Sequence, residues 1–256
     1  MKSLKATVVV LTLLGALAPA LAAQEPQILV SAAASLTDVL TGLAPRAEQA
    51  IGAKLLFNFG ASGALRRQIE EGAPVDLFFS ASSEDMEKLE KAGLVVSASR
   101  KDLLSNRMVL IGSPGTLPVD SADALKSLIS GVPLLALGNP DTVPAGRYAM
   151  QALETYGLSA VVASKLVLGG NVREVLQYVQ SGSAPLGIVF RTDVLAASRG
   201  SVQQVFVFPE TSTRLILYPV AVVSASRNQE AAARLVQFLQ GDVARSAFQN
   251  AGFIQK

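Results

Sequence analysis

Short apolar runs alternate with segments of helical periodicity almost to the end of this chain of 256 residues. Short apolar runs bounded by turn residues are typical of buried strands, and apolar residues spaced three or four apart are typical of amphipathic helices. A strand, a helix and a second strand in succession form a unit whose strands lie parallel, with the helix on one face of the sheet. The alternation therefore predicts an α/β protein with parallel strands covered by helices.

The expected elements follow this alternation. The expected strands cover residues 28–31, 54–59, 77–80, 108–112, 134–137, 165–168, 186–190, 202–208 and 215–223. The expected helices cover residues 35–49, 63–71, 84–92, 122–129, 145–156, 172–180, 229–239 and 243–250. Gly93 and Gly157 stand where helices commonly end on a left-handed residue. Capping boxes are expected at Ser35 with Asp38 and at Asn171 with Glu174.

Four of the helix starts have sequences that suit an anion. They lie at Ser35, after Ala61-Ser62-Gly63, at Pro144-Ala145-Gly146 and at Gly170-Asn171-Val172. The first backbone N–H groups of a helix have no internal partner, and the aligned peptide dipoles add partial positive charge at that end. Such helix starts bind oxyanions. Four of them in one chain predict an oxyanion-binding protein.

Taken one at a time, these residues have a simpler interpretation. Ser35 and Ser62 are residues that commonly cap helices, whether or not a ligand is near. Ala145 and Val172 carry no polar side chain and would be ordinary first-turn residues. Four arginines lie near the helix starts: Arg66, Arg67, Arg147 and Arg173. They are interpreted as solvated surface residues, because most charged side chains are exposed, with the alternative that some face the mouth of the cleft and attract anions. The joint pattern, not any single residue, favours a site.

The first residues have the pattern of a secretory signal. Lys2 and Lys5 precede an apolar run over residues 6–18, and Ala20-Leu21-Ala22 matches the small-x-small pattern of a cleavage site. We expect cleavage near Ala23 and export to the periplasm. Removing residues 1–23 takes away two lysines and no acidic residue, which lowers the formal net charge from +2 to 0. A neutral chain disfavours nucleic acid and anionic membranes as partners.

The sequence contains no histidine and no cysteine. Their absence excludes Ser-His-Asp triads, Cys-His pairs, disulfides and zinc sites of the usual kind. We therefore expect a binding protein and not an enzyme, with no cofactor and no metal cation held directly by side chains. A serine nucleophile with a lysine base is the enzymatic alternative, but no lysine lies in the four candidate segments.

Longer motifs point to a family. They are AAASLT at 32–37, QIEEGAPVDLF at 68–78, GNPDTVPAGRYA at 138–149, APLGIV at 184–189 and YPVAVV at 218–223. In these segments the chain resembles the periplasmic molybdate-binding proteins of molybdate ABC transporters, and the segments span most of the chain in order. The resemblance implies capture of molybdate, and also tungstate, for delivery to permease subunits of an ABC importer at the inner membrane. It also implies a monomer.

The resemblance implies a two-lobed periplasmic-binding-protein fold with the ligand cleft between the lobes. Each lobe is expected to be a mostly parallel sheet flanked by helices, and two crossing strands are expected to join them. The long apolar runs at 103–110 and 215–223 are the candidates for these crossings. The expected lobe 1 consists of residues 24–104 with 219–256, and the expected lobe 2 consists of residues 105–218.

The ligand contacts are implied by the resemblance too. Ser35 and Ser62 are expected to donate through hydroxyl and backbone N–H, and Ala145 and Val172 through backbone N–H. The family usually has a tyrosine at the position of Phe190, which has no hydroxyl to donate. Two outcomes stay open: binding is weaker, or water or a neighbouring hydroxyl such as that of Thr192 substitutes.

The expected donor set bears on which anion is bound. A site of pure donors leaves the proton of a protonated phosphate without a partner, which disfavours that anion. Sulfate presents the same acceptors as molybdate, so it remains the alternative ligand, to be rejected only by cavity size.

Overall fold

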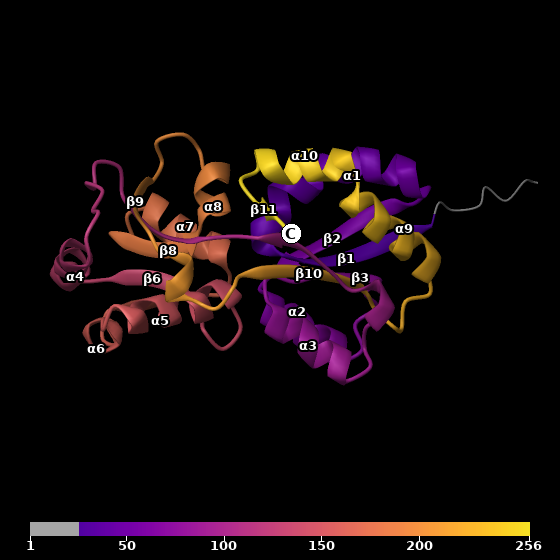
Figure 1. Cartoon of the computed structure of the whole chain (residues 1–256), viewed down its shortest axis with the longest axis horizontal. Coiled ribbons are helices and arrows are strands. Elements are labelled where there is room, and N and C mark those ends of the chain that lie inside the picture. Colours follow the sequence, from indigo (N-terminus) through magenta and orange to yellow (C-terminus); the bar gives the residue numbers. More distant parts are fainter. Residues whose placement is uncertain (1–25) are drawn as a thin grey trace, which may run out of the picture.

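The structure, a computed structural model, describes residues 26–256 as two lobes that lie end to end (Figure 1). The expected signal at residues 1–23 lies outside the described residues. One lobe is built on a six-stranded sheet of order β11-β4-β10-β3-β1-β2, and the other on a five-stranded sheet of order β7-β6-β8-β5-β9. We call them lobe 1 and lobe 2, respectively.

Lobe 1 combines the two ends of the described chain. Its strands are β1 (Gln27–Ala33), β2 (Lys54–Gly60), β3 (Leu77–Phe79), β4 (Lys101–Ser105), β10 (Leu217–Val222) and β11 (Ile254–Gln255). Its helices are α1 (Thr37–Ile51), α2 (Ser62–Glu70), α3 (Ser83–Lys91), α9 (Gln229–Gln240) and α10 (Asp242–Asn250), with short 3-10 turns η1 (Ala34–Leu36) and η2 (Ser97–Ser99). Helices α1, α9 and α10 cover one face of the sheet, and α2 and α3 cover the other (Figure 1).

Lobe 2 is formed by the middle of the chain. Its strands are β5 (Met108–Gly112), β6 (Leu135–Gly138), β7 (Leu166–Gly169), β8 (Leu186–Phe190) and β9 (Gln203–Val207). Its helices are α4 (Ala122–Gly131), α5 (Pro144–Thr155), α6 (Ser159–Val162), α7 (Val172–Gln180) and α8 (Arg191–Ala196), with a 3-10 turn η3 (Glu210–Ser212). The chain passes between the lobes twice, from β4 to β5 and from β9 to β10 (Figure 1).

Both sheets are mixed. Strand β1 pairs in parallel with β2 and β3, and β6 pairs in parallel with β7 and β8. The strands on either side of the crossings run the other way: β10 is antiparallel to β3 and β4, and β5 is antiparallel to β8 and β9. The two-lobed α/β fold is confirmed, but the expectation of mostly parallel sheets is wrong: β11 is also antiparallel to β4, so five of the nine strand pairs in the described residues are antiparallel.

Strand β3 is apolar throughout, and its side chains contribute to the core on both faces of the lobe 1 sheet. Leu77 and Phe79 pack into the cluster beneath α1 and α9, whereas Phe78 packs into a second cluster with Leu65 of α2 and Met86 of α3. Successive side chains of a strand point to opposite faces, so a run of three apolar residues serves both layers. A fully apolar strand is therefore what a sheet covered on both sides requires.

Several local predictions can be checked directly. Gly93 and Gly157 have φ values of +69° and +67°, which confirms the predicted helix ends. Helices α6 and α8 and strand β11 have no counterpart among the expected elements, because segments of two to six residues are too short to show a period. The apolar run at 103–110 divides into β4 and β5 at Asn106 and Arg107.

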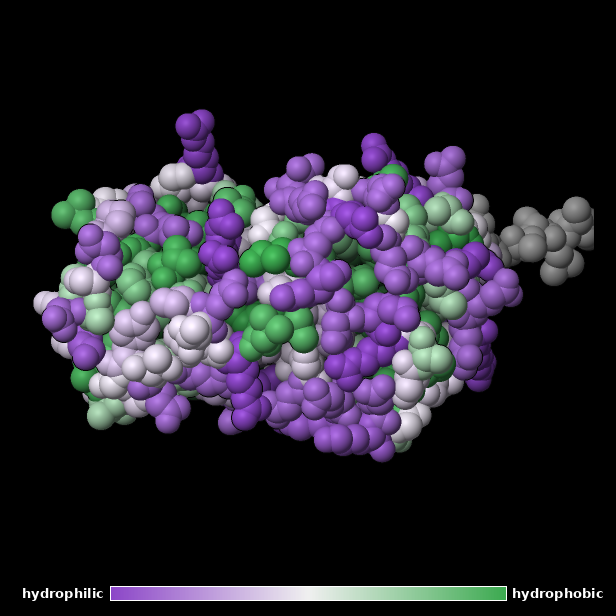
Figure 2. Space-filling model, in the orientation of Figure 1, coloured by the Kyte–Doolittle hydropathy of each residue, from purple (hydrophilic) through white to green (hydrophobic). Residues whose placement is uncertain are grey.

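The visible surface differs between the lobes. Figure 2 shows lobe 1 as mainly hydrophilic on this face, with more hydrophobic residues over lobe 2 and near the junction. Exposed large apolar side chains in lobe 2 include Leu117 and Leu195. Among residues 26–256, no helix has the length and apolar character needed to cross a membrane.

Candidate functional site

The five residues expected to hold an anion line one hollow between the lobes. Ser35, Ser62, Ala145, Val172 and Phe190 are joined there by Ala33, Ala34, Gly60, Ala61, Ala81, Val143 and Pro144. All twelve lining residues are uncharged. The five expected residues are each no more than 4% exposed, so little of the hollow is open to solvent. Its volume is about 10 Å³, which is roughly the space that one water requires.

The topology explains why residues so far apart in sequence meet here. In lobe 1, Ser35 follows β1, Ser62 follows β2 and Ala81 follows β3. In lobe 2, Ala145 follows β6 and Val172 follows β7, while Phe190 is the last residue of β8. The carboxyl ends of parallel strands meet at one edge of a sheet, where α/β proteins bind their ligands. The two such edges face each other across the hollow.

Three α-helices begin at the hollow. Ser62 is the first residue of α2, Ala145 is the second of α5 and Val172 is the first of α7. First-turn N–H groups have no intrahelical acceptor, and each helix start carries partial positive charge. Asn171 caps α7 by accepting from the N–H groups of Arg173 and Glu174, at 2.9 and 3.2 Å. The predicted capping box is confirmed only in this half, because the Glu174 carboxylate accepts from the N–H of Gly170 and from Asn171 Nδ2 instead of the Asn171 N–H. That cap does not use the N–H of Val172.

The two serine hydroxyls are held in different ways. Ser62 Oγ accepts a hydrogen bond of 2.9 Å from the backbone N–H of Ala81, so its own proton remains available to donate. Ser35 Oγ lies 2.9 Å from the hydroxyl of Tyr218. The expected capping box of Ser35 with Asp38 is wrong, because Ser35 lies within the 3-10 turn η1 and α1 begins only at Thr37 without a side-chain cap.

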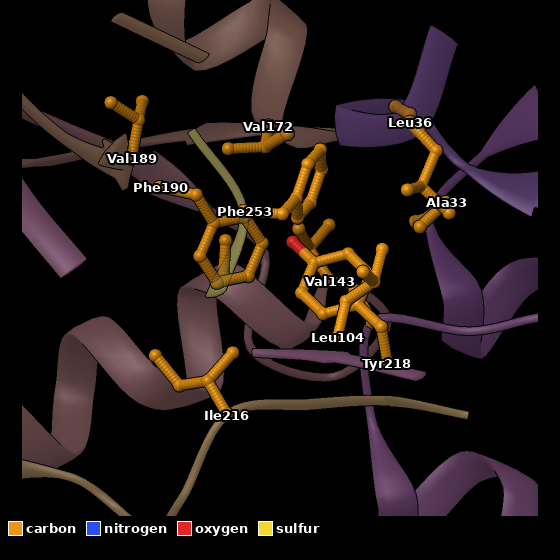
Figure 3. Packing of buried hydrophobic residues seen from close by; sticks show 14 of the residues in the cluster. Ala33, Leu36, Leu104, Val143, Val172, Val189, Phe190, Ile216, Tyr218 and Phe253 are labelled. Carbon is orange, nitrogen blue, oxygen red and sulfur yellow. The ribbon is translucent and has the colours of Figure 1, made fainter. Parts of the chain in front are cut away.

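Phe190 places an aromatic ring at the hollow in an aromatic cluster at the lobe junction (Figure 3). Its ring centroid lies 5.8 Å from that of Tyr218 and 6.4 Å from that of Tyr148. Thr192, an expected substitute for the missing hydroxyl, is not among the residues that line the hollow. Its Oγ1 accepts 2.9 Å from Asn106 Nδ2 instead.

Ion pairs at the rim connect the lobes. Arg147 of α5 donates to Asp85 and, at 3.2 Å, to Ser82 Oγ, both in lobe 1. Arg173 of α7 donates to Asp38 Oδ2 at 2.6 Å. The interpretation of these two arginines, and of Arg66, as solvated surface residues is wrong: their side chains are 14–25% exposed and hold carboxylates. Arg66 bonds Asp85 Oδ1 at 3.1 Å.

Burial alters the protonation of groups near the hollow. It raises the pKa of Tyr218 well above the usual range, so this phenol keeps its proton. Burial also raises the pKa of Asp193 to about 7, although Arg173 Nε lies 2.9 Å from its Oδ1. Neither group lines the hollow. The hollow thus offers an anion hydroxyls, backbone amides and helix starts only.

A larger groove lies beside the junction, and unlike the hollow it is lined in part by charged side chains, Asp38 and Arg46. It has a volume of about 580 Å³ and runs between α1, α8 and α10. Of the five expected residues it touches only Ser35. In the described residues, no group of three or more acidic or other metal-binding side chains is placed to hold a metal ion. The closed hollow is therefore the candidate anion site.

Comparison with known proteins supports this assignment at the level of the family. Residues 28–254 match the family model described as bacterial extracellular solute-binding protein. The chain is 37% identical to the molybdate-binding protein ModA of Escherichia coli (strain K12) over 238 residues, which cover 91% of each chain. This similarity confirms the resemblance that the motifs indicate.

Two solved structures show the same fold. The periplasmic molybdate-binding protein of Azotobacter vinelandii aligns with a TM-score of 0.76 at 24% identity, covering 89% of this chain and 98% of that one. The sulfate-binding protein SubI of Mycobacterium tuberculosis H37Rv aligns with a TM-score of 0.75 at 20% identity, covering 89% and 86%. This chain belongs to the bacterial extracellular solute-binding protein family.

Proposed function

We propose that this protein is a periplasmic solute-binding protein that captures molybdate, and also tungstate, and delivers the anion to an ABC importer. The observation that carries the proposal is the hollow with twelve uncharged lining residues, at which helix starts from both lobes meet. The 37% identity to a molybdate-binding protein supports molybdate over other anions. The proposed ligand contacts are Ser35, Ser62, Ala145 and Val172, with the ring of Phe190 closing the site.

The chemistry of the hollow suits a fully deprotonated dianion. Molybdate oxygens only accept hydrogen bonds. The groups at the hollow act as donors: Ser62 Oγ already accepts from the Ala81 N–H and so can donate its proton, and the first-turn amides of α5 and α7 are N–H donors. Hydrogen bonds to a charged group are stronger than neutral ones and offset the cost of removing water from the anion. Because no arginine or lysine lines the hollow, release does not require breaking a buried ion pair.

Binding requires the lobes to move. A space of about 10 Å³ is too small for an anion with four oxygens to enter while the hollow is closed. We propose that the lobes, residues 24–104 with 219–256 and residues 105–218, open about the two crossings and close over the anion. Closure of two domains around a ligand is a common device of binding proteins and gives a permease a shape to recognise. We propose a monomer, exported by cleavage of the signal at residues 1–23.

Thermal unfolding of the mature chain with molybdate, tungstate, sulfate and phosphate tests the proposal. A ligand present at about 1,000 times its Kd stabilises a native state by about 4 kcal/mol. We expect a large rise in Tm with molybdate and tungstate and little change with phosphate. An equal rise with sulfate would favour the sulfate alternative, and no rise with any of the four anions would refute the oxyanion proposal.

We further propose that the protein is not an enzyme. Arg66 is the basic residue nearest in sequence to Ser62, and a guanidinium does not act as a base at neutral pH. Incubation with generic esters is expected to give no turnover. Turnover that disappears in Ser35→Ala would contradict this part of the proposal.

A further inference from the structure

A buried chain of polar groups lies directly behind Ser35. Tyr218 is fully buried, and Asn106, Thr192 and Ser35 are each no more than 4% exposed. The hydroxyl of Tyr218 lies 2.9 Å from Ser35 Oγ and 3.1 Å from Asn106 Nδ2. Buried polar groups that form a connected network are more costly to disturb than exposed ones. This network ends at the wall of the candidate anion site.

The direction of each hydrogen bond in the chain is determined by the backbone. The N–H of Arg107 donates to Asn106 Oδ1 at 2.9 Å, which makes Oδ1 the acceptor side of the amide. Asn106 Nδ2 therefore faces Tyr218 and Thr192 and donates to both hydroxyl oxygens. Since Tyr218 accepts from Asn106, its own proton must go elsewhere. Ser35 Oγ is the remaining partner of that hydroxyl within the described part of the chain.

Ser35 then accepts from Tyr218 and has its own proton left over. Ser35 lines the hollow, so that proton is available to a bound ligand. We propose that Asn106 and Tyr218 are positioning residues that orient the Ser35 hydroxyl as an obligatory donor to the bound oxyanion. This inference rests on the proposed function. It means that Asn106 and Tyr218, which lie outside the hollow, make the site reject protonated anions by preventing Ser35 from acting as an acceptor. A hydroxyl without such a partner can rotate and accept a proton from a ligand instead.

The location of the chain links it to the junction between the lobes. Asn106 lies between β4 and β5, in the first crossing, and Tyr218 is the second residue of β10, directly after the second crossing. Thr192 belongs to lobe 2 and Ser35 to lobe 1. Figure 3 shows Tyr218 beside Phe190 at this junction. The hydrogen bonds that orient Ser35 therefore depend on how the lobes sit at the crossings.

A double-mutant cycle tests the proposal, with Kd for molybdate and for phosphate measured by calorimetry on the mature chain. Tyr218→Phe is expected to raise the molybdate Kd about tenfold, because Ser35 would no longer be held as a donor and its hydrogen bond to the charged ligand would be lost. Tyr218→Phe is also expected to lower the ratio of the phosphate Kd to the molybdate Kd, because a free Ser35 hydroxyl can accept the proton of phosphate. In a Ser35→Ala background, Tyr218→Phe is expected to have no further effect. Tyr156→Phe, which removes a hydroxyl from an aromatic cluster in lobe 2, is the matched control.

A second variant covers the case in which Tyr218→Phe does not fold. Asn106→Asp keeps the acceptor for the Arg107 N–H but replaces the donor by an acceptor. Tyr218 would then donate to residue 106, and Ser35 would donate to Tyr218, away from the ligand. The molybdate Kd is expected to rise at least tenfold, and the rise should vanish in the Ser35→Ala background. If the carboxylate introduced at this position instead simply repelled the anion, Asn106→Asp would still raise the molybdate Kd in the Ser35→Ala background.

The outcomes are distinguishable. Additive effects of the Tyr218 or Asn106 variants with Ser35→Ala, or an unchanged ratio of phosphate to molybdate Kd in Tyr218→Phe, would overturn the positioning role while leaving the proposed function intact. Failure of the unmutated protein to bind molybdate would overturn the proposed function and the inference together. Non-additive effects of the Tyr218 and Asn106 variants with Ser35→Ala, together with an unchanged molybdate Kd in Tyr156→Phe, would support the positioning role.

Discussion

At the scale of single residues, Phe190 contributes a ring without a hydroxyl to the lining of the hollow. Its ring lines the space, and its nearest aromatic neighbours are Tyr218 and Tyr148. The family resemblance implies a tyrosine at this position. The ring is therefore placed where a hydroxyl would be useful, but this chain does not have one.

We predict that Phe190→Tyr tightens molybdate binding. A hydrogen bond to a charged group contributes about 1.5–3 kcal/mol, and the cost of fitting one extra atom into a packed site reduces this gain. The expected net effect is a fall in Kd of about tenfold, measured by calorimetry. Phe206→Tyr, on β9 of lobe 2 and outside the hollow, is the matched control. An unchanged Kd in Phe190→Tyr would show that position 190 does not reach the ligand.

The raised pKa of Asp193 leads us to predict how the free energy of unfolding depends on pH. It is fully buried, accepts from the Phe190 N–H at 3.2 Å, and burial raises its pKa from 3.8 to about 7. Because the folded protein holds this proton more tightly than the unfolded chain, the stabilisation is complete below about pH 4 and is lost as the pH rises towards 7. The free energy of unfolding contributed by Asp193 should therefore fall across this range.

Urea unfolding of the unmutated protein and of Asp193→Asn, at intervals from pH 4 to 7.5, measures this contribution. The difference in unfolding free energy between the two proteins should change steadily between pH 4 and 7 and level off above. A difference that is independent of pH would mean that the ion pair with Arg173 keeps Asp193 ionised throughout, against this prediction.

At the scale of elements, the site depends on how closely a helix start approaches a strand. A Cβ atom at Gly146 would lie 1.9 Å from the backbone oxygen of Gly138 at the end of β6. Glycine is needed here because of close contact between backbones. The position of the Ala145 N–H follows from this contact, since α5 cannot approach β6 so closely with a side chain between them.

We predict that Gly146→Ala displaces α5 and its first amides. The variant should lose roughly 1–3 kcal/mol of stability, as overpacked sites do, and should bind molybdate more than tenfold less tightly. Chemical unfolding and calorimetry measure the two effects. Gly131→Ala, at the end of α4 where a Cβ meets nothing within 4 Å, should change neither quantity appreciably. Normal binding by Gly146→Ala would show that the N-terminus of α5 does not contribute to the site.

At the scale of the whole molecule, the closed arrangement rests on a few contacts between the lobes. The N–H of Gly63 in α2 donates to the backbone oxygen of Thr142 in lobe 2 at 3.0 Å. The ion pairs of Arg147 and Arg173 with Asp85 and Asp38 lie at the rim. A Cβ at Gly63 would lie 2.6 Å from the oxygen of Thr142. Closure is thus sensitive to a single methyl group.

We predict that Gly63→Ala prevents full closure without unfolding either lobe. The ligand-free Tm should change little, because the clash is between lobes, whereas the molybdate Kd should rise at least tenfold through loss of contacts made only on closing. Small-angle scattering should show a smaller contraction with molybdate than in the unmutated protein. Gly42→Ala, where a Cβ meets nothing within 4 Å, is the control. Unchanged affinity would mean that binding does not need the closed arrangement.

The type and order of most elements followed from the sequence. Apolar periodicity is a local property, and runs such as Leu77–Phe79 are buried on both faces as their composition requires. The cap at Asn171 and the helix ends at Gly93 and Gly157 are likewise decided within a few residues. Five of the twelve residues that line the hollow were also expected from sequence, through the joint pattern at helix starts and the family resemblance. They meet because the carboxyl ends of parallel strands share an edge of a sheet.

Only the tertiary structure decided what lies around those residues. Ser35 bonds Tyr218, Arg173 bonds Asp38, and Arg147 bonds Asp85, although these partners are 62 to 183 positions apart. No local pattern encodes such pairs, since each depends on how two lobes and two crossings come together. The sequence by itself therefore determined most elements and which helix starts could serve a site, and the packing of the lobes determined how the residues of the hollow are oriented and enclosed.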